Sequence, residues 1–213
     1  MFSGIVQGRR PVVEVTPGED SRAIVVDLGD LATGLGRGAS VAIAGVCLTA
    51  VEIDGSRVRF EIMGETLERT TLGNLQAGSE VNIERSAKVG DEIGGHRVSG
   101  HVAGRARISK IERPEGNCVM TFVCESDWMQ YILPKGFIAL DGCSLTVVDV
   151  GNTPPPGGAS WFTAHFIPET LRITTFGIKK VGDEVNLEID PETQTIVETV
   201  RRYLESHGPQ HLS

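Results

Sequence analysis

The sequence predicts an all-β protein made of two similar barrels in tandem, followed by one α-helix. Three observations predict this fold class: an internal duplication, short strand patterns separated by glycine-bearing turns, and a single helical pattern near the carboxy end. The chain has 213 residues and 40% hydrophobic content. Each half can therefore bury a core, and we expect two folded domains.

The duplication runs from the first residues to the start of the terminal helix. Residues 65–84 and 169–188 align without a gap, and 11 of 20 positions are identical. Two further pairs of blocks match, residues 3–9 with 99–105 and residues 42–49 with 139–146. The offset between the copies then grows from 97 to 104 residues. We place this gain at residues 151–158, whose prolines and glycines indicate a surface loop.

Each copy contains short segments typical of strands. Residues 57–62 alternate polar and apolar side chains, and residues 119–123 form a Val-, Met- and Phe-containing run. Such strands favour a small antiparallel barrel, because closure removes exposed strand edges. We expect a positive φ at three glycine pairs that recur in turns: Gly45 and Gly142, Gly73 and Gly177, Gly78 and Gly182.

One helix follows the second copy. Asp190 can cap its amino end and Pro191 suits its first position. Its apolar residues recur at helical spacing: Ile196, Val197, Val200, Tyr203 and Leu204. This stripe either packs on its own barrel or is shared with other subunits. His207 and His211 are expected in a polar tail.

Composition excludes several classes of function. The net charge is −8 and no lysine or arginine cluster is present, so nucleic acid is not an expected partner. No membrane span or leader pattern is found, so we expect a cytoplasmic protein. Cys47, Cys118, Cys124 and Cys143 lack metal-ligand spacing and are expected to be thiols, with no metal site. No phosphate loop or dinucleotide fingerprint is present, so ATP and NAD are not implied.

Differences between the copies indicate where chemistry could occur. The first copy has Cys47 where the second has Ser144, and Ile5 where the second has His101. His96 lies five residues before His101, at the junction of the copies. Histidine can move protons near neutral pH, and a thiol can act as a nucleophile. Taken alone, each of these residues is more often structural than catalytic.

Four segments carry a resemblance to a known family: residues 1–6 (MFSGIV), 45–49 (GVCLT), 94–101 (GGHRVSGH) and 167–171 (IPETL). In this order they resemble the riboflavin synthase family over essentially the full chain. The resemblance implies two antiparallel six-stranded Greek-key barrels, each binding lumazine, and a carboxy-terminal helix that joins three subunits. It implies the boundaries 1–93 and 94–189 for the barrels, 190–206 for the helix and 207–213 for the tail.

The resemblance also implies a reaction. Two molecules of 6,7-dimethyl-8-ribityllumazine would give riboflavin and 5-amino-6-ribitylaminouracil without a cofactor, at a site between subunits of a homotrimer. The duplication suits this chemistry, because donor and acceptor are the same molecule and two related sites can hold them together. The resemblance allows association with a separate lumazine synthase.

Site residues follow from the resemblance. The chemical candidates are Phe2, Ser40, Cys47, His96, His101, Ser144 and Asp190. The first site would use Gly4, Ile5, Val6, Cys47, Leu48, Thr49, Glu61, Ile62, Met63, Gly64, Glu65 and Thr66. The second would use Gly100, His101, Val102, Lys135, Ser144, Leu145, Thr146, His165, Phe166, Ile167, Pro168, Glu169 and Thr170.

We assign proton transfer to His101 and place Cys47 or Ser40 near the nucleophilic addition. Asp190 and His96 would give polar support.

The chain departs from the family pattern at three residues, and a second function is considered. Ser3 replaces a threonine, Ala44 a polar residue such as asparagine, and Ala103 an aspartate, which we interpret as tuning of affinity. The alternative is a noncatalytic antenna protein that binds lumazine or flavin. Such proteins resemble this family but are degraded at the histidine junction, which is intact here.

Overall fold

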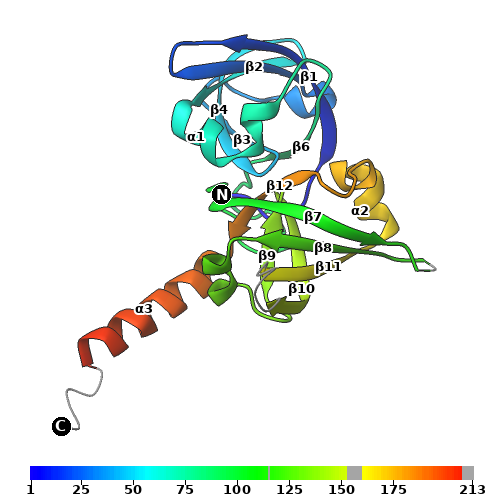
Figure 1. Ribbon diagram of the computed structural model, residues 1–213. Helices are drawn as coiled ribbons and strands as arrows, with labels where there is room; N and C mark the ends of the chain where they lie inside the picture. The colour runs from blue at the N-terminus through cyan, green and yellow to red at the C-terminus, as the bar shows by residue number, and fades with distance from the viewer. Residues whose placement is uncertain (115, 153–159, 208–213) are drawn as a thin grey trace, which may run out of the picture.

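The computed structural model describes residues 1–114, 116–152 and 160–207, and it contains two closed β-barrels and a terminal helix (Figure 1). The first barrel consists of β1 (Gly8–Pro17), β2 (Ser21–Asp27), β3 (Ser40–Ile43), β4 (Val46–Asp54), β5 (Arg57–Met63) and β6 (Glu80–Arg85), with α1 (Gly64–Arg69) after β5. The second consists of β7 (Gly104–Glu112), β8 (Cys118–Cys124), β9 (Phe137–Leu140), β10 (Cys143–Asn152), β11 (Ser160–Phe166) and β12 (Glu184–Ile189), with α2 (Pro168–Ile173) after β11. The last element is α3 (Pro191–His207).

The two barrels have the same topology. Around the first, neighbouring strands follow the order β1, β2, β5, β4, β3 and β6, and the second repeats it as β7, β8, β11, β10, β9 and β12. All pairings are antiparallel. The predicted fold class is confirmed, and closure leaves neither sheet with a free edge.

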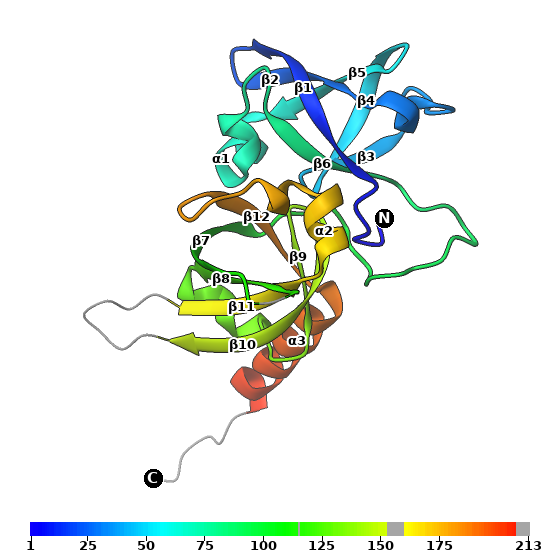
Figure 2. The same ribbon diagram turned by 90° about the vertical axis from the view of Figure 1, so that its right-hand side faces the viewer.

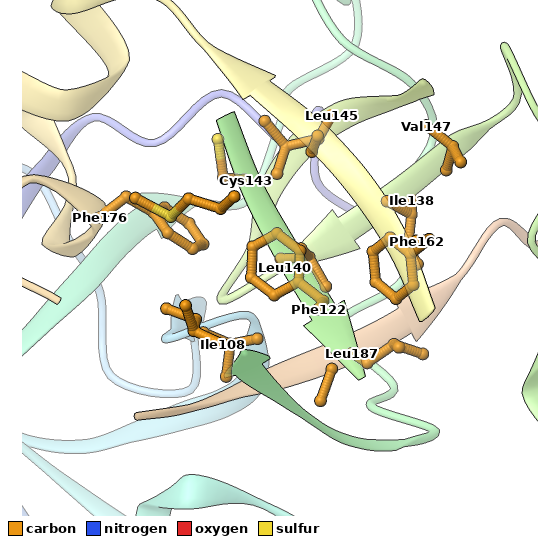
Figure 3. Close-up of a cluster of buried hydrophobic side chains, with 14 of the residues drawn as sticks. Ile108, Phe122, Ile138, Leu140, Cys143, Leu145, Val147, Phe162, Phe176 and Leu187 are labelled. Atoms are coloured by element: carbon orange, nitrogen blue, oxygen red, sulfur yellow. The ribbon is translucent and has the colours of Figure 1, made fainter. Parts of the chain in front are cut away.

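Alternating side chains build each core. In β5, Val58, Phe60 and Ile62 point inward, as the sequence pattern predicts. In the second barrel, Phe122 stacks on Phe162 with ring centroids 5.3 Å apart, and Figure 3 shows this pair among the aliphatic side chains of the surrounding strands. Burial of these two apolar clusters holds each barrel together.

Two sequence predictions about loops need correction or limitation. The positive φ is found at Gly45, Gly142, Gly78 and Gly182, but not at Gly73 and Gly177. Those two lie in 3-10 helices, where a Cβ would meet the carbonyl oxygens of Leu67 and Leu171 at 2.5 and 2.1 Å. They are needed for close approach and not for a left-handed turn. Of the predicted insertion at 151–158, residues 151 and 152 end β10, and 153–158 lie outside the described residues.

Helix α3 begins as predicted. The backbone nitrogen and hydroxyl of Thr193 donate to Asp190 Oδ2 at 2.9 and 2.6 Å, which caps the first turn. His207 is the last helical residue rather than part of the tail, and its ring stacks on Tyr203. Figure 1 shows α3 extending away from the second barrel.

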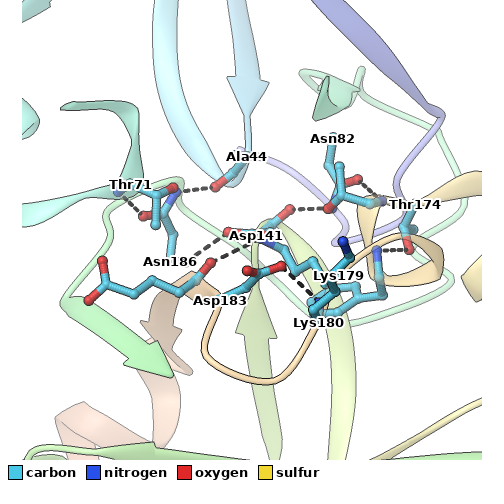
Figure 4. A network of polar contacts seen from close by, with 12 residues as sticks. Ala44, Thr71, Asn82, Asp141, Thr174, Lys179, Lys180, Asp183 and Asn186 are labelled. Carbon is cyan, nitrogen blue, oxygen red and sulfur yellow. Dashed lines mark hydrogen bonds and ion pairs between the residues drawn. The ribbon is translucent and has the colours of Figure 1, made fainter. Parts of the chain in front are cut away.

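Two asparagines lock the barrels together at matching places (Figure 4). Asn82 Nδ2 donates to the Asp141 carbonyl at 3.0 Å, and Asn186 Nδ2 donates to the Ala44 carbonyl at 2.8 Å. Their Oδ1 atoms accept from the backbone nitrogens of Thr175 and Thr71, each at 2.7 Å. Each asparagine belongs to one barrel and satisfies backbone groups of the other.

Candidate functional site

The segments that precede the two barrels cross over at their junction. Phe2 and Val98 form an antiparallel bridge through two backbone hydrogen bonds of 2.8 and 3.0 Å. Figures 1 and 2 both place the amino terminus at this junction, and Figure 2 shows the long connection between β6 and β7 running out to one side. We call residues 2–6 and 98–102 the exchanged segments.

Each exchanged segment lies against the opposite barrel. The Ser144 backbone nitrogen, in the second barrel, donates to the Gly4 carbonyl at 2.8 Å. The Cys47 backbone nitrogen, in the first barrel, donates to the Gly100 carbonyl at 3.0 Å. Farther along, Val6 is buried in the core of the second barrel. Its counterpart Val102 packs on the core of the first.

Both contacts require glycine. A Cβ on Gly4 would lie 2.5 Å from Ser144 Cβ, and one on Gly100 would lie 2.5 Å from Cys47 Cβ. Both glycines also have positive φ, at 74° and 84°. The close approach and the left-handed backbone therefore both favour glycine here.

The predicted binding residues fall into two groups, which we name the Cys47 site and the Ser144 site. The Cys47 site comprises residues 47–49, 61–66 and 100–102, and the Ser144 site comprises residues 144–146, 165–170 and 4–6. The predicted pairing of 4–6 with Cys47 and of 100–102 with Ser144 is wrong as a spatial grouping, because the exchanged segments cross to the other barrel. Lys135 lies on the second barrel, where its backbone nitrogen donates to the Val147 carbonyl at 2.7 Å.

Exposed side chains of neighbouring strands line the two sites in the same way. Strands β4 and β5 pair through Ala50 and Phe60, which brings Thr49 beside Glu61. Strands β10 and β11 pair through Val147 and Ala164, which brings Thr146 beside His165. All four of these side chains are exposed. The sites thus share a threonine and differ in the residue next to it.

The helix that follows each pair of strands starts at the same position. Helix α1 begins at Gly64 and α2 at Pro168, each directly after an exposed apolar residue, Met63 or Ile167. The first turns carry Glu65 and Glu169, and Thr66 and Thr170 are half-buried. The predicted segments 61–66 and 165–170 therefore have matching conformations.

A histidine and a serine form the most enclosed polar pair of the Ser144 site. His96 Nδ1 lies 2.6 Å from Ser144 Oγ, and the imidazole stacks on Phe137 with centroids 5.1 Å apart. Burial lowers the pKa of His96, and the charge of Asp190 partly offsets this. A neutral imidazole can accept the serine proton, so this pair is chemically suited to activate or orient a hydroxyl.

The Cys47 site has a different set of groups. Cys47 is half-buried and His101 is exposed. Ser40 pairs with Thr49 across β3 and β4, so it belongs to this site as well. Three of the predicted chemical residues are thus on one barrel face, with no enclosed histidine like His96 among them.

Phe2 lies between the sites and not in either of them. Its side chain is 1% exposed and packs in a small cluster with Ala42, Val98 and Ala139. Cys47 also packs against this cluster. The structure therefore gives Phe2 a packing position at the junction of the barrels.

Sequence reasoning missed two buried carboxylates that hold the exchanged segments. Glu84 Oε1 accepts from the Ser3 nitrogen at 2.7 Å and from its hydroxyl at 2.8 Å, and Oε2 accepts from the Gly4 nitrogen at 3.1 Å. Glu188 makes the same contacts to Ser99 and Gly100, at 2.6, 2.7 and 3.0 Å. Both glutamates are among the identical positions of the duplication, and that identity was the signal that could have found them.

The departures from the family pattern have structural explanations. Ser3 keeps the hydroxyl that donates to Glu84. Ala44 is buried with φ of 47°, and its carbonyl accepts from Asn186 of the other barrel. Asparagine would suit this left-handed backbone, and the effect of Ala44 on ligand affinity stays a prediction. Ala103 packs against the core of the second barrel.

None of the helices in the described residues has the length and apolar character of a transmembrane span. Within residues 1–114, 116–152 and 160–207, no three histidine, cysteine, aspartate or glutamate side chains gather as metal ligands would.

Comparisons with known proteins agree on one family. The lumazine binding domain model matches residues 3–86 and 99–190. Riboflavin synthase of Escherichia coli (strain K12) is 50% identical over 96% of this chain and 93% of its own length. Riboflavin synthase of Chlamydia pneumoniae is 41% identical over 98% of this chain and 99% of its own length. Among solved structures, LumP complexed with 6,7-dimethyl-8-(1'-D-ribityl) lumazine superposes with a TM-score of 0.78, at 23% identity, over 89% of this chain and 99% of that one. That last likeness concerns the fold alone.

Proposed function

The chain belongs to the riboflavin synthase family, and on this premise we propose that it converts two molecules of 6,7-dimethyl-8-ribityllumazine into riboflavin and 5-amino-6-ribitylaminouracil. The observation that carries the proposal is 50% identity to a riboflavin synthase over 96% of the chain. A four-carbon unit passes from one lumazine to the other. Atoms balance between the two substrates and the two products, so no oxidant, reductant or cofactor is consumed.

Two similar sites suit a reaction between two copies of one molecule. Matching threonines, matching helix starts and matching exchanged segments would hold the two lumazines alike. The groups around them differ, with Cys47 and His101 at one site and Ser144 and His96 at the other. A donor and an acceptor that are the same molecule need two sites that bind it in the same way but supply different reactive groups.

We assign proton transfer at the Cys47 site to the exposed imidazole of His101, which can remove the acidic methyl proton of a bound lumazine. Cys47 or Ser40 would lie near the nucleophilic addition. At the other site, His96 would orient Ser144, and Asp190 would add a negative charge near His96. Phe2 would act by packing, since it is buried.

The duplication supplies matched variants for these roles. His101→Ile introduces the residue that the first copy has at the equivalent position, Ile5. Cys47→Ser introduces the residue that the second copy has there, Ser144. We expect His101→Ile to lower kcat by roughly 10²-fold or more, in line with the loss of a general base. Turnover at the wild-type rate in either variant would remove that residue from the mechanism.

We further propose that the chain works as a homotrimer joined through α3. The exposed apolar residues of the helix support this: Ile196, Val200, Tyr203 and Leu204 are 64%, 52%, 60% and 60% exposed. In such an assembly the Cys47 site of one subunit would face the Ser144 site of a neighbour, so that two bound lumazines could meet.

The experiment is to mix the purified protein with 6,7-dimethyl-8-ribityllumazine and no cofactor. Riboflavin is followed by absorbance, and product stoichiometry by chromatography. We expect one riboflavin for every two lumazines consumed. Tight binding without conversion would instead favour the alternative, a noncatalytic antenna protein that binds lumazine or flavin.

A further inference from the structure

We propose that Glu84 and Glu188 are positioning residues for the dismutation, each carried by one barrel and each setting the geometry of the ligand site on the other barrel. This inference rests on the proposed function. Neither residue belongs to the predicted set of binding and chemical residues.

The first step is the contact geometry. Each carboxylate accepts three hydrogen bonds, two from a serine and one from the following glycine, at distances between 2.6 and 3.1 Å. The serine hydroxyl also accepts from the next backbone nitrogen, that of Ile5 at 3.3 Å or that of His101 at 3.1 Å. One carboxylate therefore fixes three consecutive residues of an exchanged segment.

The second step is the crossing. Glu188 lies in β12 of the second barrel, but the segment that it fixes carries Gly100, whose carbonyl accepts from Cys47 in the first barrel. The same segment carries His101, whose backbone nitrogen donates to the hydroxyl of Ser99, the serine that Glu188 holds. Glu84 lies in β6 of the first barrel, and its segment contacts Ser144 in the second.

The third step is the cost of burial. Glu84 and Glu188 are each only 4% exposed. Burial raises the pKa of both carboxyls, although the hydrogen bonds from Ser3, Gly4, Ser99 and Gly100 oppose the rise. A carboxyl whose pKa is raised on folding lowers stability at neutral pH, because the contribution that it makes when protonated is lost as pH rises. The same cost recurs in matching places of both barrels, as expected if the two carboxylates position the two sites.

No neutral side chain makes the same three contacts. A glutamine can accept through Oε1, but its amide group would direct hydrogens at the glycine nitrogen, which is itself a donor. Glu84→Gln and Glu188→Gln should therefore loosen the exchanged segments while removing a buried charge. Misplacement of reacting groups by about 1 Å can cost roughly 10²-fold in rate.

The test uses four variants and two measurements. Glu84→Gln and Glu188→Gln are compared with Glu80→Gln and Glu184→Gln, which lie on the same strands in exposed ion pairs with Arg9 and Arg105. We expect the first two to lower kcat/KM at least about tenfold. Their melting temperatures should stay within a few degrees of wild type, and the controls should match wild type in both.

The second measurement reports on one site alone. The rate at which iodoacetamide alkylates Cys47 is followed by mass spectrometry, with the half-buried Cys124 as an internal reference. We expect Glu188→Gln to change the Cys47 rate by several-fold and Glu84→Gln to leave it unchanged, although Glu84 is in the same barrel as Cys47.

Three results would overturn the proposal: wild-type kcat/KM in both variants, losses of activity that only follow losses of melting temperature, or equal effects of both variants on Cys47. If a glutamine variant fails to fold, Ser3→Ala and Ser99→Ala remove one hydrogen bond each and should give a smaller effect with the same crossed pattern. A wild-type protein without turnover would refute the proposed function, whereas the alkylation pattern would still test the crossed positioning.

Discussion

At the scale of single residues, we assign the chemistry to positions at which the two copies differ. Cys47 and Ser144 occupy equivalent strand positions, and each receives an exchanged segment through its backbone nitrogen. Among the described residues, a histidine lies within hydrogen-bond distance of the Ser144 side chain but not of Cys47.

The lowered pKa of His96 predicts the pH dependence of catalysis. Its folded pKa lies below the ordinary 6.5 because burial disfavours the imidazolium. The neutral ring, and the stability linked to it, is therefore kept above 6.5 and lost as pH falls through the folded pKa. We expect kcat/KM to be flat from neutral pH down to 6.5 and to fall below it. His96→Asn should lower kcat and remove the contribution of His96 to this acid limb in a pH–rate profile; an unchanged limb would assign it to another group, such as the proposed base His101.

Ala44 predicts a stabilising substitution. A left-handed backbone costs a non-glycine residue about 1–2 kcal/mol, and asparagine adopts it more readily than alanine. Ala44 also borders a cleft of about 480 Å³ between the barrels, which has room for a larger side chain. We expect Ala44→Asn to raise the melting temperature by about 2–4 °C. Ala44→Val should lower it, since a β-branched side chain suits this φ poorly; a rise with valine would contradict the argument.

At the scale of elements, both barrels contribute an equivalent asparagine to the interface between them, but within the part of the chain that the structure describes only the second barrel contributes an ion pair there. Asp141 and Lys179 form an ion pair of 3.0 Å, with side chains 3% and 17% exposed. The equivalent residues of the first copy are Ala44 and Leu75. Equivalent positions at the interface between the barrels thus hold an ion pair in the second copy and two apolar side chains in the first.

This asymmetry predicts a double-mutant result. Lys179→Leu alone leaves Asp141 buried without its partner and should cost about 3–5 kcal/mol. Adding Asp141→Ala copies the first barrel and should recover most of the loss, because a buried ion pair is often replaceable by packed apolar residues. Urea unfolding of the single and double variants measures the cycle. A double variant as unstable as Lys179→Leu would show that the ion pair itself is required.

At the scale of the whole molecule, one face of α3 packs on the second barrel and another face is exposed to solvent. Val197 packs against the core of the second barrel, and Tyr131 donates a hydrogen bond to Glu198. The exposed stripe of the helix does not contact its own barrel in this way. Of the two roles that the sequence left open, shared packing between subunits is the one we propose.

Polar substitutions on α3 should separate binding from catalysis. We expect Val200→Asp combined with Leu204→Asp to give a monomer in analytical ultracentrifugation. Such a monomer should bind 6,7-dimethyl-8-ribityllumazine, followed by fluorescence, but should lose riboflavin formation, because one subunit would lack the facing site of its neighbour. Arg202→Gln, on the same helix, is the control. A monomer with full turnover would place the complete site within one chain.

The sequence by itself determined the two barrels, the terminal helix with its Asp190 cap, and the family. These features depend on local patterns and on repeats, which can be identified directly in the amino-acid sequence. Three features came only from the tertiary structure. They are the barrel that each exchanged segment contacts, the close approach that requires glycine at Gly73, and the position of Ala44 at the interface between the barrels. Each of these depends on contacts between residues far apart in the chain, such as Gly4 with Ser144 and Glu188 with Ser99. Crossing of the exchanged segments leaves no periodic signal, since the same residues would be present if each segment packed on its own barrel.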